Sequence, residues 1–171
     1  MQDLFRLARL DAEHNLSGFV CGVPELDRWL ADLAHRMALQ DITRTWVWTS
    51  PDSQDVVAYF SIAPTRIANA DLPRSASGGH SEVPGYLIGR LALDRSIQGR
   101  GLGRFLLLDA LDLIVASSAT SGGRLIIVDS IDERAAIFYR RYGFRATRTG
   151  PRLFLKVATA RKALADPDAV R

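Results

Sequence analysis

The chain has 171 residues, of which 47% are hydrophobic and 24% are charged, and this composition is typical of a single globular domain with a buried core. Its one cysteine, Cys21, excludes an intramolecular disulfide and a cysteine zinc cluster, and we expect it to be a buried apolar residue. No secretory signal is visible at the start, and no apolar run reaches the ~20 residues of a membrane span, so we expect a cytoplasmic protein without a membrane partner.

Charge is unevenly distributed along the chain. Residues 1–89 carry 7 basic and 11 acidic residues, whereas residues 90–171 carry 15 basic and 8 acidic ones. Twenty of the 22 cations are arginine, which binds phosphate through two parallel hydrogen bonds. A basic second half indicates a polyanionic partner, but a solvated arginine-rich surface would look the same. Charge alone leaves both interpretations open.

The first half of the chain predicts strands on either side of a helix. Residues 4–10 form a strand, residues 11–22 are rich in turns with room for a short helix, and a longer helix begins at Pro24. Two β-rich runs, 44–49 and 56–63, flank a turn and predict an antiparallel hairpin. Apolar residues at helical spacing form the core stripe of the helix: Leu26, Trp29, Leu30, Leu33 and Met37.

The second half alternates strands and helices. Residues 71–85 contain Pro, Ser and Gly and predict a surface loop whose length indicates substrate contact. A central strand, a helix, a strand buried on both faces, a helix capped by Asp132 and two final strands follow over residues 86–93, 101–117, 124–129, 132–141, 144–147 and 153–157. We expect one domain over residues 1–171, with a core at about 4–157 and a polar tail that frays near Pro167.

A glycine-rich turn, Gln98–Gly103, joins the central strand to the helix that follows it. The first N–H groups of a helix have no internal partner, and the helix dipole adds partial positive charge there. Glycines remove the side chains that would keep a phosphate away from these groups. The turn therefore predicts a pyrophosphate site, although a flexible Gly/Arg turn without a ligand remains an alternative.

Two common phosphate motifs do not fit this turn. A P-loop needs a lysine after its glycines, and no lysine occurs before Lys156. A dinucleotide fingerprint needs its third glycine one place later, where Arg104 stands. A metal centre is not supported either: His14 and His35 lack the partners of a metal site, and His80 is expected to be a solvated loop histidine.

Gln98, Gly101 and Gly103 fit the pattern Gln/Arg-x-x-Gly-x-Gly/Ala, and on this motif the chain resembles the GCN5-related N-acetyltransferases (GNAT). The order of elements over residues 4–157 is similar to that family's fold. A second match, residues 138–144, resembles the family's F-Y-x-x-x-G-F run, whose tyrosine points at the sulfur of CoA. The resemblance implies an α/β (α+β) GNAT fold: a mixed, mostly antiparallel central sheet of about six or seven strands, flanked by helices.

Two further runs narrow the resemblance. Residues 19–22 followed by Leu26-Asp27 and Trp29-Leu30 are similar to the start of the TacT-like GNAT toxins of bacterial type II toxin–antitoxin systems, and residues 90–94 match their R-L-A-V-D run. This resemblance implies an acetyl-CoA-dependent enzyme that acetylates the α-amine of aminoacyl-tRNA and blocks translation. It also implies a homodimer and a ribbon-helix-helix antitoxin as partner.

The resemblance assigns the following roles. Tyr139 is the candidate general acid that protonates the leaving thiolate, and backbone N–H groups near Leu91 and Leu93 are expected to stabilise the oxyanion. No general base is evident; Asp129 and Glu82 are the candidates, acting through water. The cofactor-binding set comprises Leu91, Ala92, Leu93, Gln98, Gly99, Arg100, Gly101, Leu102, Gly103 and Arg104.

One departure concerns the position before the last core helix. The family has a neutral CoA contact there, whereas this chain has Asp132 and Glu133, so that contact is not carried over. Seven arginines are candidates for tRNA phosphates: Arg90, Arg95, Arg140, Arg141, Arg145, Arg148 and Arg152. Two alternatives remain open: an acetyltransferase for a protein N-terminus or small amine, and a CoA-binding regulatory module without catalysis.

Overall fold

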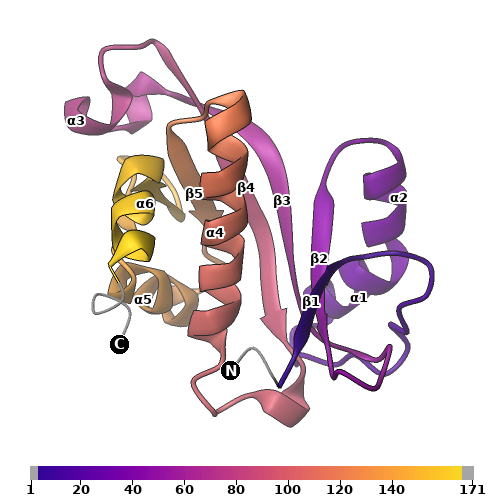
Figure 1. Cartoon of the computed structure of the whole chain (residues 1–171). Helices are drawn as coiled ribbons and strands as arrows, with labels where there is room; N and C mark the ends of the chain where they lie inside the picture. Colours follow the sequence, from indigo (N-terminus) through magenta and orange to yellow (C-terminus); the bar gives the residue numbers. More distant parts are fainter. Residues whose placement is uncertain (1–3, 167–171) are drawn as a thin grey trace. The chain divides into compact units, whose positions relative to one another are not determined.

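A computed structural model describes residues 4–166 of the chain. Within this range seven strands form one sheet in the order β1-β2-β3-β4-β5-β7-β6 (Figure 1). The β4–β5 pair is parallel, and the β1–β2, β2–β3, β5–β7 and β6–β7 pairs are antiparallel. The expected mixed, mostly antiparallel sheet is therefore confirmed. Its strands are β1 (Arg6–Arg9), β2 (Arg44–Thr49), β3 (Val56–Ala68), β4 (Glu82–Leu93), β5 (Leu125–Asp129), β6 (Arg145–Ala146) and β7 (Arg152–Lys156).

The chain forms two compact units, which are described separately. The first comprises the residues up to Ala63 together with Gly89–Leu108, and the second comprises Pro64–Ile88 and the residues from Asp109 onward. The single-domain expectation stays a prediction. The helices of the described chain are α1 (Pro24–Asp32), α2 (Ala34–Leu39), α3 (Arg74–Ser77), α4 (Gly103–Ser121), α5 (Glu133–Arg141) and α6 (Val157–Ala165), with 3-10 turns at Asn69–Asp71 and Arg95–Ile97.

In the first unit, α1 and α2 pack on the β2–β3 hairpin. The apolar side chains of Trp29 and Leu30 are buried together with Val47 and Tyr59 of the hairpin. The expected single helix is wrong in one detail: the helix is interrupted at Leu33, whose φ of −117° departs from the ideal helical value, and two helices result. Residues 11–22 contain turns but no helix. The predicted hairpin itself is confirmed, with β3 continuing beyond residue 63 to Ala68.

In the second unit, β5 is buried over Leu125–Val128 and lies between β4 and β7. The segment predicted to be a surface loop, residues 71–85, is instead partly helical and partly core. Leu72 and Ala76 are almost fully buried in a cluster with Leu125, Ile127 and Phe154. Burial of these apolar side chains explains why a segment rich in Pro, Ser and Gly is ordered.

Two helices extend further than the sequence indicated. Helix α4 continues through Ser121 and ends where Gly122 and Gly123 adopt positive φ. Residues 157–165, assigned to the polar tail, form α6, whose Val157 and Ala160 are buried. Alanine has high helix propensity, and residues 157–165 contain four alanines. The prediction of a polar tail followed the charged and polar residues of this segment and missed the helix. Pro167, where fraying was expected, lies outside the described residues.

Residues 4–166 lack two features that would bear on function. No described helix combines the length and the apolar character needed to cross a bilayer. Nor do three or more His, Cys, Asp or Glu side chains gather within this range in a way that could hold a metal ion.

Candidate active site

The glycine turn between β4 and α4 presents backbone to open space. Gly99 and Gly101 have φ of +75° and +70°, a conformation that costs other residues about 1–2 kcal/mol. A Cβ atom added at either glycine would meet no protein atom within 4 Å. Packing within the protein therefore does not explain these glycines; the left-handed backbone and an open approach do. The geometry fits a ligand that contacts main-chain N–H groups.

The same turn is followed by the first amides of α4. The N–H groups of Phe105 and Leu106 both donate to the carbonyl of Leu102, at 3.0 and 3.2 Å. The amides that precede them in the first turn have no carbonyl four residues back to accept from, as in any helix start. Leu102 is buried and anchors this end of the helix, so these amides are held in a fixed position. They would suit the diphosphate of CoA.

Hydrogen bonds with residues 20–21 fix the segment before the glycines. The Asp94 carboxylate accepts from the backbone N–H groups of Val20 and Ser96 at 2.8 and 2.9 Å, and the N–H of Arg95 donates to the Val20 carbonyl at 2.9 Å. Burial alone would raise the pKa of Asp94, but these hydrogen bonds outweigh it, so the pKa lies below its usual value. Asp94 is thus an ionised anchor for the turn.

Gln98 has its side chain turned toward the protein. Its amide Nε2 donates to the carbonyl of Cys21 and to that of Leu93, both at 2.7 Å. The side chain therefore ties the glycine turn to the end of β4, and only its backbone is left for a cofactor. Sequence analysis placed Gln98 in the cofactor set but could not show that its amide acts as an internal brace.

Three further residues of the predicted cofactor-binding set, Leu91, Ala92 and Leu93, lie at the end of β4. The parallel register of β4 with β5 spans Gly85 to Ile88, and β4 then continues to Leu93. Ala92 is buried in the core beneath α1, whereas Leu91 and Leu93 are half-buried. Because successive side chains alternate between faces, Leu91 and Leu93 share the other face of the strand.

Arg100 and Arg104, expected to serve CoA phosphates, are both exposed. The guanidinium of Arg104 lies 4.4 Å from the centre of the Phe105 ring, a cation–π distance. Gly103 forms the first residue of α4. These positions leave both arginines accessible to an anion at the helix start.

Arg90 is positioned by an aromatic stack that sequence analysis assigned only to the core. Its guanidinium lies 4.6 Å from the centre of the Trp29 ring, and Trp29 stacks on Tyr59 with ring centres 5.9 Å apart. The Tyr59 hydroxyl donates to the Leu26 carbonyl at 2.8 Å. Helical spacing showed that Trp29 was buried, but not that it would support a cation on β4.

Cys21 is buried in the same unit, as expected. Burial, with a hydrogen bond to Asp27, raises the pKa of its thiol to about 11. The thiol therefore stays protonated near neutral pH and is a poor nucleophile. This agrees with acyl transfer that proceeds without a cysteine intermediate.

In the second unit, Tyr139 lies on α5, which begins at a side-chain cap: the Asp132 carboxylate accepts from the N–H of Ala135 at 2.7 Å. The Tyr139 side chain is 8% exposed and makes edge-on ring contacts with Phe138 and Phe144, at 5.2 and 5.4 Å between ring centres. Burial raises the pKa of Tyr139 above its usual value. The phenol is therefore held in the protonated form that a proton donor requires.

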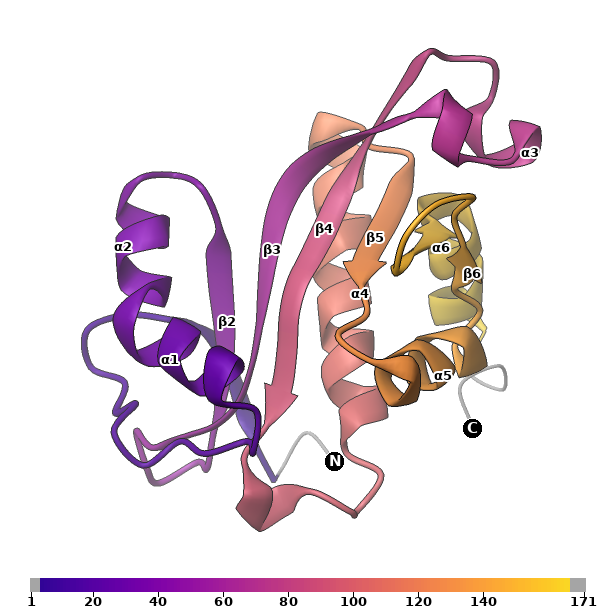
Figure 2. The ribbon, with the colours of Figure 1, turned by 180° about the vertical axis from the view of Figure 1, so that it is seen from behind.

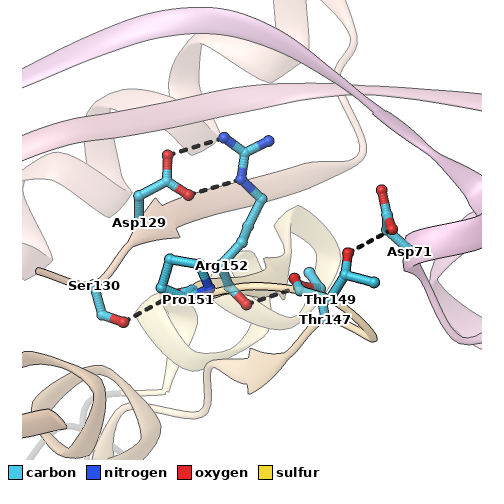
Figure 3. Close-up of polar contacts among 7 residues, drawn as sticks. All are labelled: Asp71, Asp129, Ser130, Thr147, Thr149, Pro151 and Arg152. Carbon is cyan, nitrogen blue, oxygen red and sulfur yellow. Dashed lines mark hydrogen bonds and ion pairs between the residues drawn. The ribbon is translucent and has the colours of Figure 1, made fainter. Parts of the chain in front are cut away.

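Asp129, one candidate base, is held in an ion pair. Its two carboxylate oxygens accept from Nε and Nη2 of Arg152 at 2.7 and 2.9 Å (Figure 3). These hydrogen bonds raise the pKa of Arg152 and use its fork on an internal partner. The pair weakens both predictions, because the Asp129 carboxylate and the Arg152 guanidinium are engaged with each other rather than free for an amine or a phosphate.

The neighbouring loop is held by Asp71. Thr149 Oγ1 donates to the Asp71 carboxylate at 2.7 Å (Figure 3). The N–H of Arg148 donates to the Asp71 carbonyl at 2.9 Å. Glu82, the other candidate base, is exposed and pairs with Arg66 at 3.3 Å. Asp129 and Glu82, the two candidate bases, are therefore both engaged with arginines rather than placed to accept a proton from an amine.

The remaining arginine candidates are exposed. Arg140 bonds to Glu133 at 2.8 Å on the surface of α5. The guanidinium of Arg95 lies against Gly22 in the first unit, where an added Cβ would come within 3.1 Å of its Nε. Arg141, Arg145 and Arg148 are also exposed. The seven candidate arginines thus differ in whether the guanidinium already contacts a carboxylate or an aromatic ring of the protein.

Comparison with known proteins agrees with the motifs. Residues 44–146 match the acetyltransferase (GNAT) domain model. The chain is 34% identical to a tRNA-acetylating toxin of Mycobacterium tuberculosis over 92% of its length and 95% of the relative's. It is 30% identical to a probable toxin TacT of Sinorhizobium fredii over 86% of its length and 88% of the relative's.

Solved structures of AtaT are also similar. AtaT in complex with acetyl-methionyl-tRNAfMet matches with a TM-score of 0.85 and 25% identity, covering 92% of this chain and 98% of AtaT. The AtaTR complex bound with acetyl-CoA matches with a TM-score of 0.82 and 26% identity, covering 94% of this chain and 98% of the matched one.

Proposed function

This chain belongs to the GNAT acetyltransferase family, and from that premise we propose that it is a toxin that transfers an acetyl group from acetyl-CoA to the α-amine of aminoacyl-tRNA. The observation that carries the proposal is the open, left-handed glycine turn at the start of α4, which fits a diphosphate held by backbone amides. Relatives that acetylate tRNA, and AtaT with an acetylated aminoacyl-tRNA, support the choice of acceptor.

In the proposed mechanism the amine attacks the thioester carbonyl directly. A new C–N bond forms, the C–S bond breaks, and the amine loses one proton while the departing thiolate gains one. The backbone N–H groups near Leu91 and Leu93 stabilise the negative charge on the carbonyl oxygen. Tyr139 donates a proton, or a strong hydrogen bond, to the sulfur. Because burial disfavours the phenolate, the protonated form of Tyr139 is the favoured one at the start of each turnover.

A strong base is not needed for this acceptor. An α-amine titrates near ~8 and a lysine side chain near ~10.4, so far more of the α-amine is neutral at pH 7. The electron-withdrawing ester of an aminoacyl-tRNA lowers the pKa of the amine further. The weak placement of Asp129 and Glu82 as bases therefore favours an aminoacyl ester over a lysine side chain.

We infer partners from the same premise. Acetyl-CoA is the cosubstrate, and AtaT, a related toxin, has been solved with the C-terminus of its antitoxin AtaR. For this chain we propose a ribbon-helix-helix antitoxin, a homodimer and a cytoplasmic location. Exposed arginines near α5, chiefly Arg141, Arg145 and Arg148, are proposed to contact tRNA phosphates.

The decisive experiment is incubation of the purified protein with labelled acetyl-CoA and total charged tRNA, followed by identification of the acetylated amino acid. We expect label on the α-amine of one or a few aminoacyl-tRNAs. Lysine peptides and peptides with free N-termini serve as competing acceptors. If either of these is acetylated at a rate comparable to that of charged tRNA, the proposed acceptor is wrong.

A further inference from the structure

A groove in the second unit lies apart from Tyr139 and from the residues assigned to acetyl-CoA; of the residues considered for acetyl transfer it includes only Glu82, a weakly placed candidate base. It has a volume of about 510 Å³ and is lined by residues of the α3–β4 connection, the start of β5 and the first turns of α6. Figures 1 and 2 show the α3 segment beyond one end of α6. Its charged lining residues are Glu82, Arg124 and Arg161, and its apolar wall is made by Pro84, Val157 and Ala158.

Arg124 is held rigidly at one wall. Its Nε donates to the carbonyl of Ala76 at 2.7 Å. The guanidinium also packs against Gly78, which has φ of +61° and where an added Cβ would come within 3.0 Å of the Arg124 Cζ. A glycine is therefore required at this position, both by its backbone and by the close approach of the cation. The cation is pre-positioned, and a partner would lose little entropy in meeting it.

Arg161 supplies a second cation from α6. Its Nη2 donates to the Oγ of Ser118 on α4 at 3.1 Å, and Ser118 is buried. Within residues 4–166, the structure records one acceptor for each of the two guanidinium groups. A guanidinium has five N–H donors, so each fork keeps donors for an external oxyanion. Carboxylates match this fork in a bidentate geometry.

A second hollow continues the groove. It has a volume of about 380 Å³, shares Pro84 and Gly123 with the first, and adds Arg66 and Tyr86. The Tyr86 hydroxyl is fixed by the Ser121 hydroxyl and the Gly122 carbonyl, both at 2.5 Å. The combined surface therefore has a basic end with Arg124 and Arg161, an apolar middle, and a third cation, Arg66, which is paired with Glu82.

We propose that this groove binds an extended acidic peptide segment of another protein. Carboxylates of the peptide pair with Arg124 and Arg161, and an apolar side chain lies on Pro84 and Val157. Nucleic acid fits less well, because the groove has a substantial apolar wall, which does not suit a phosphate backbone. An acidic peptide with interspersed apolar residues complements this wall and the two arginines, while the carboxylate of Glu82 is paired with Arg66.

The test measures fluorescence anisotropy of a labelled dodecapeptide of alternating glutamate and leucine on the full-length protein. The test variant changes Arg161, and Lys162, the next residue of α6, gives a matched control. Both side chains are exposed, but only Arg161 lines the groove. Arg161→Glu should weaken peptide binding about ten-fold or more, as expected for loss of a charge-assisted pair and gain of a repulsive charge. Lys162→Glu should change it less than about two-fold.

A steric variant, Ala158→Trp, fills the groove without changing charge and should also weaken binding. Circular dichroism and calorimetry with acetyl-CoA on each variant verify folding and the separate cofactor site, so failure of this proposal is distinguishable from failure of the proposed function. The proposal is overturned if the peptide does not bind, if Lys162→Glu weakens it equally, or if an alternating lysine–leucine peptide binds as well. It is also overturned if Arg161→Glu weakens binding of a short RNA duplex as much as that of the peptide.

Discussion

The glycine turn of the first unit and helix α5 of the second unit present their candidate chemistry in opposite ways. In the turn, the side chains of Asp94 and Gln98 point inward and act as braces, and the backbone is left for a ligand. On α5, the backbone is used in the helix and in its cap, and the side chain of Tyr139 carries the candidate chemistry. A backbone site is sensitive to conformation, whereas a side-chain site is sensitive to the loss of a single functional group.

The largest effect is expected at the side-chain site. Tyr139→Phe removes only the hydroxyl, so the rate of acetyl transfer should fall about 100-fold or more while binding of acetyl-CoA is retained. Steady-state thiol release with charged tRNA gives kcat and KM, and calorimetry gives the Kd of acetyl-CoA. Tyr142→Phe is the matched control, because Tyr142 follows the same helix and contacts Phe138. If the rate of acetyl transfer fell equally in the two variants, the proposed catalytic role of the Tyr139 hydroxyl would be wrong.

The backbone site should respond to conformation alone. Gly101→Ala places a Cβ on a residue with φ of +70°, at a cost of about 1–2 kcal/mol, and should raise the Kd of acetyl-CoA roughly 5- to 30-fold. Gly150 offers an unusually close control, with φ of +72° and no atom within 4 Å of an added Cβ. Gly150→Ala should cost similar stability but leave acetyl-CoA binding unchanged. An equal change in Kd for both would show that the turn does not bind the cofactor.

The arginines of α5 should differ from one another. Arg140 already bonds to Glu133, whereas Arg141 is exposed with no ion pair recorded among the described residues. Arg141→Glu should therefore weaken tRNA binding more than Arg140→Glu, by several-fold, and lower the salt dependence by about one unit per lost phosphate contact. Filter binding of charged tRNA at several salt concentrations measures both. Loss of acetyl-CoA binding in either variant would contradict the separation of the two surfaces.

Sequence patterns predicted elements better than side-chain partners. The strand–glycine turn–helix order, the buried strand at 124–129 and the capped helix with Tyr139 each depend on local periodicity and local signals, and each is found in the structure. The pairing of Arg152 with Asp129 and the inward direction of Gln98 depend on residues that are distant in sequence or on opposite sides of a turn. Periodicity carries no information on such contacts, so the sequence could not predict them; the assignments of Arg152 to tRNA and of Gln98 to the cofactor stay predictions.

The smallest effect is expected from pH. The pH dependence of the rate and of the stability tests whether the Tyr139 hydroxyl is buried and stays protonated. Burial raises the pKa of this phenol above its ordinary value near 10, so the folded protein keeps the proton donor at pH 10 while the unfolded chain begins to lose it. The rate of acetyl transfer should therefore show no decline due to Tyr139 between pH 8.5 and about 10.

The stability of the fold should also depend on pH. Above the ordinary pKa of tyrosine, the Tyr139 phenol ionises only in the unfolded chain, so the free energy of unfolding should fall as pH rises. Tyr59, whose pKa is also raised by burial, adds to this fall. Thermal denaturation of Tyr139→Phe should show a smaller fall with pH than the unmodified chain. A decline in rate with an apparent pKa near 9 that disappears in Tyr139→Phe would mean that the hydroxyl is solvated, and the interpretation of Tyr139 as a buried proton donor would be wrong.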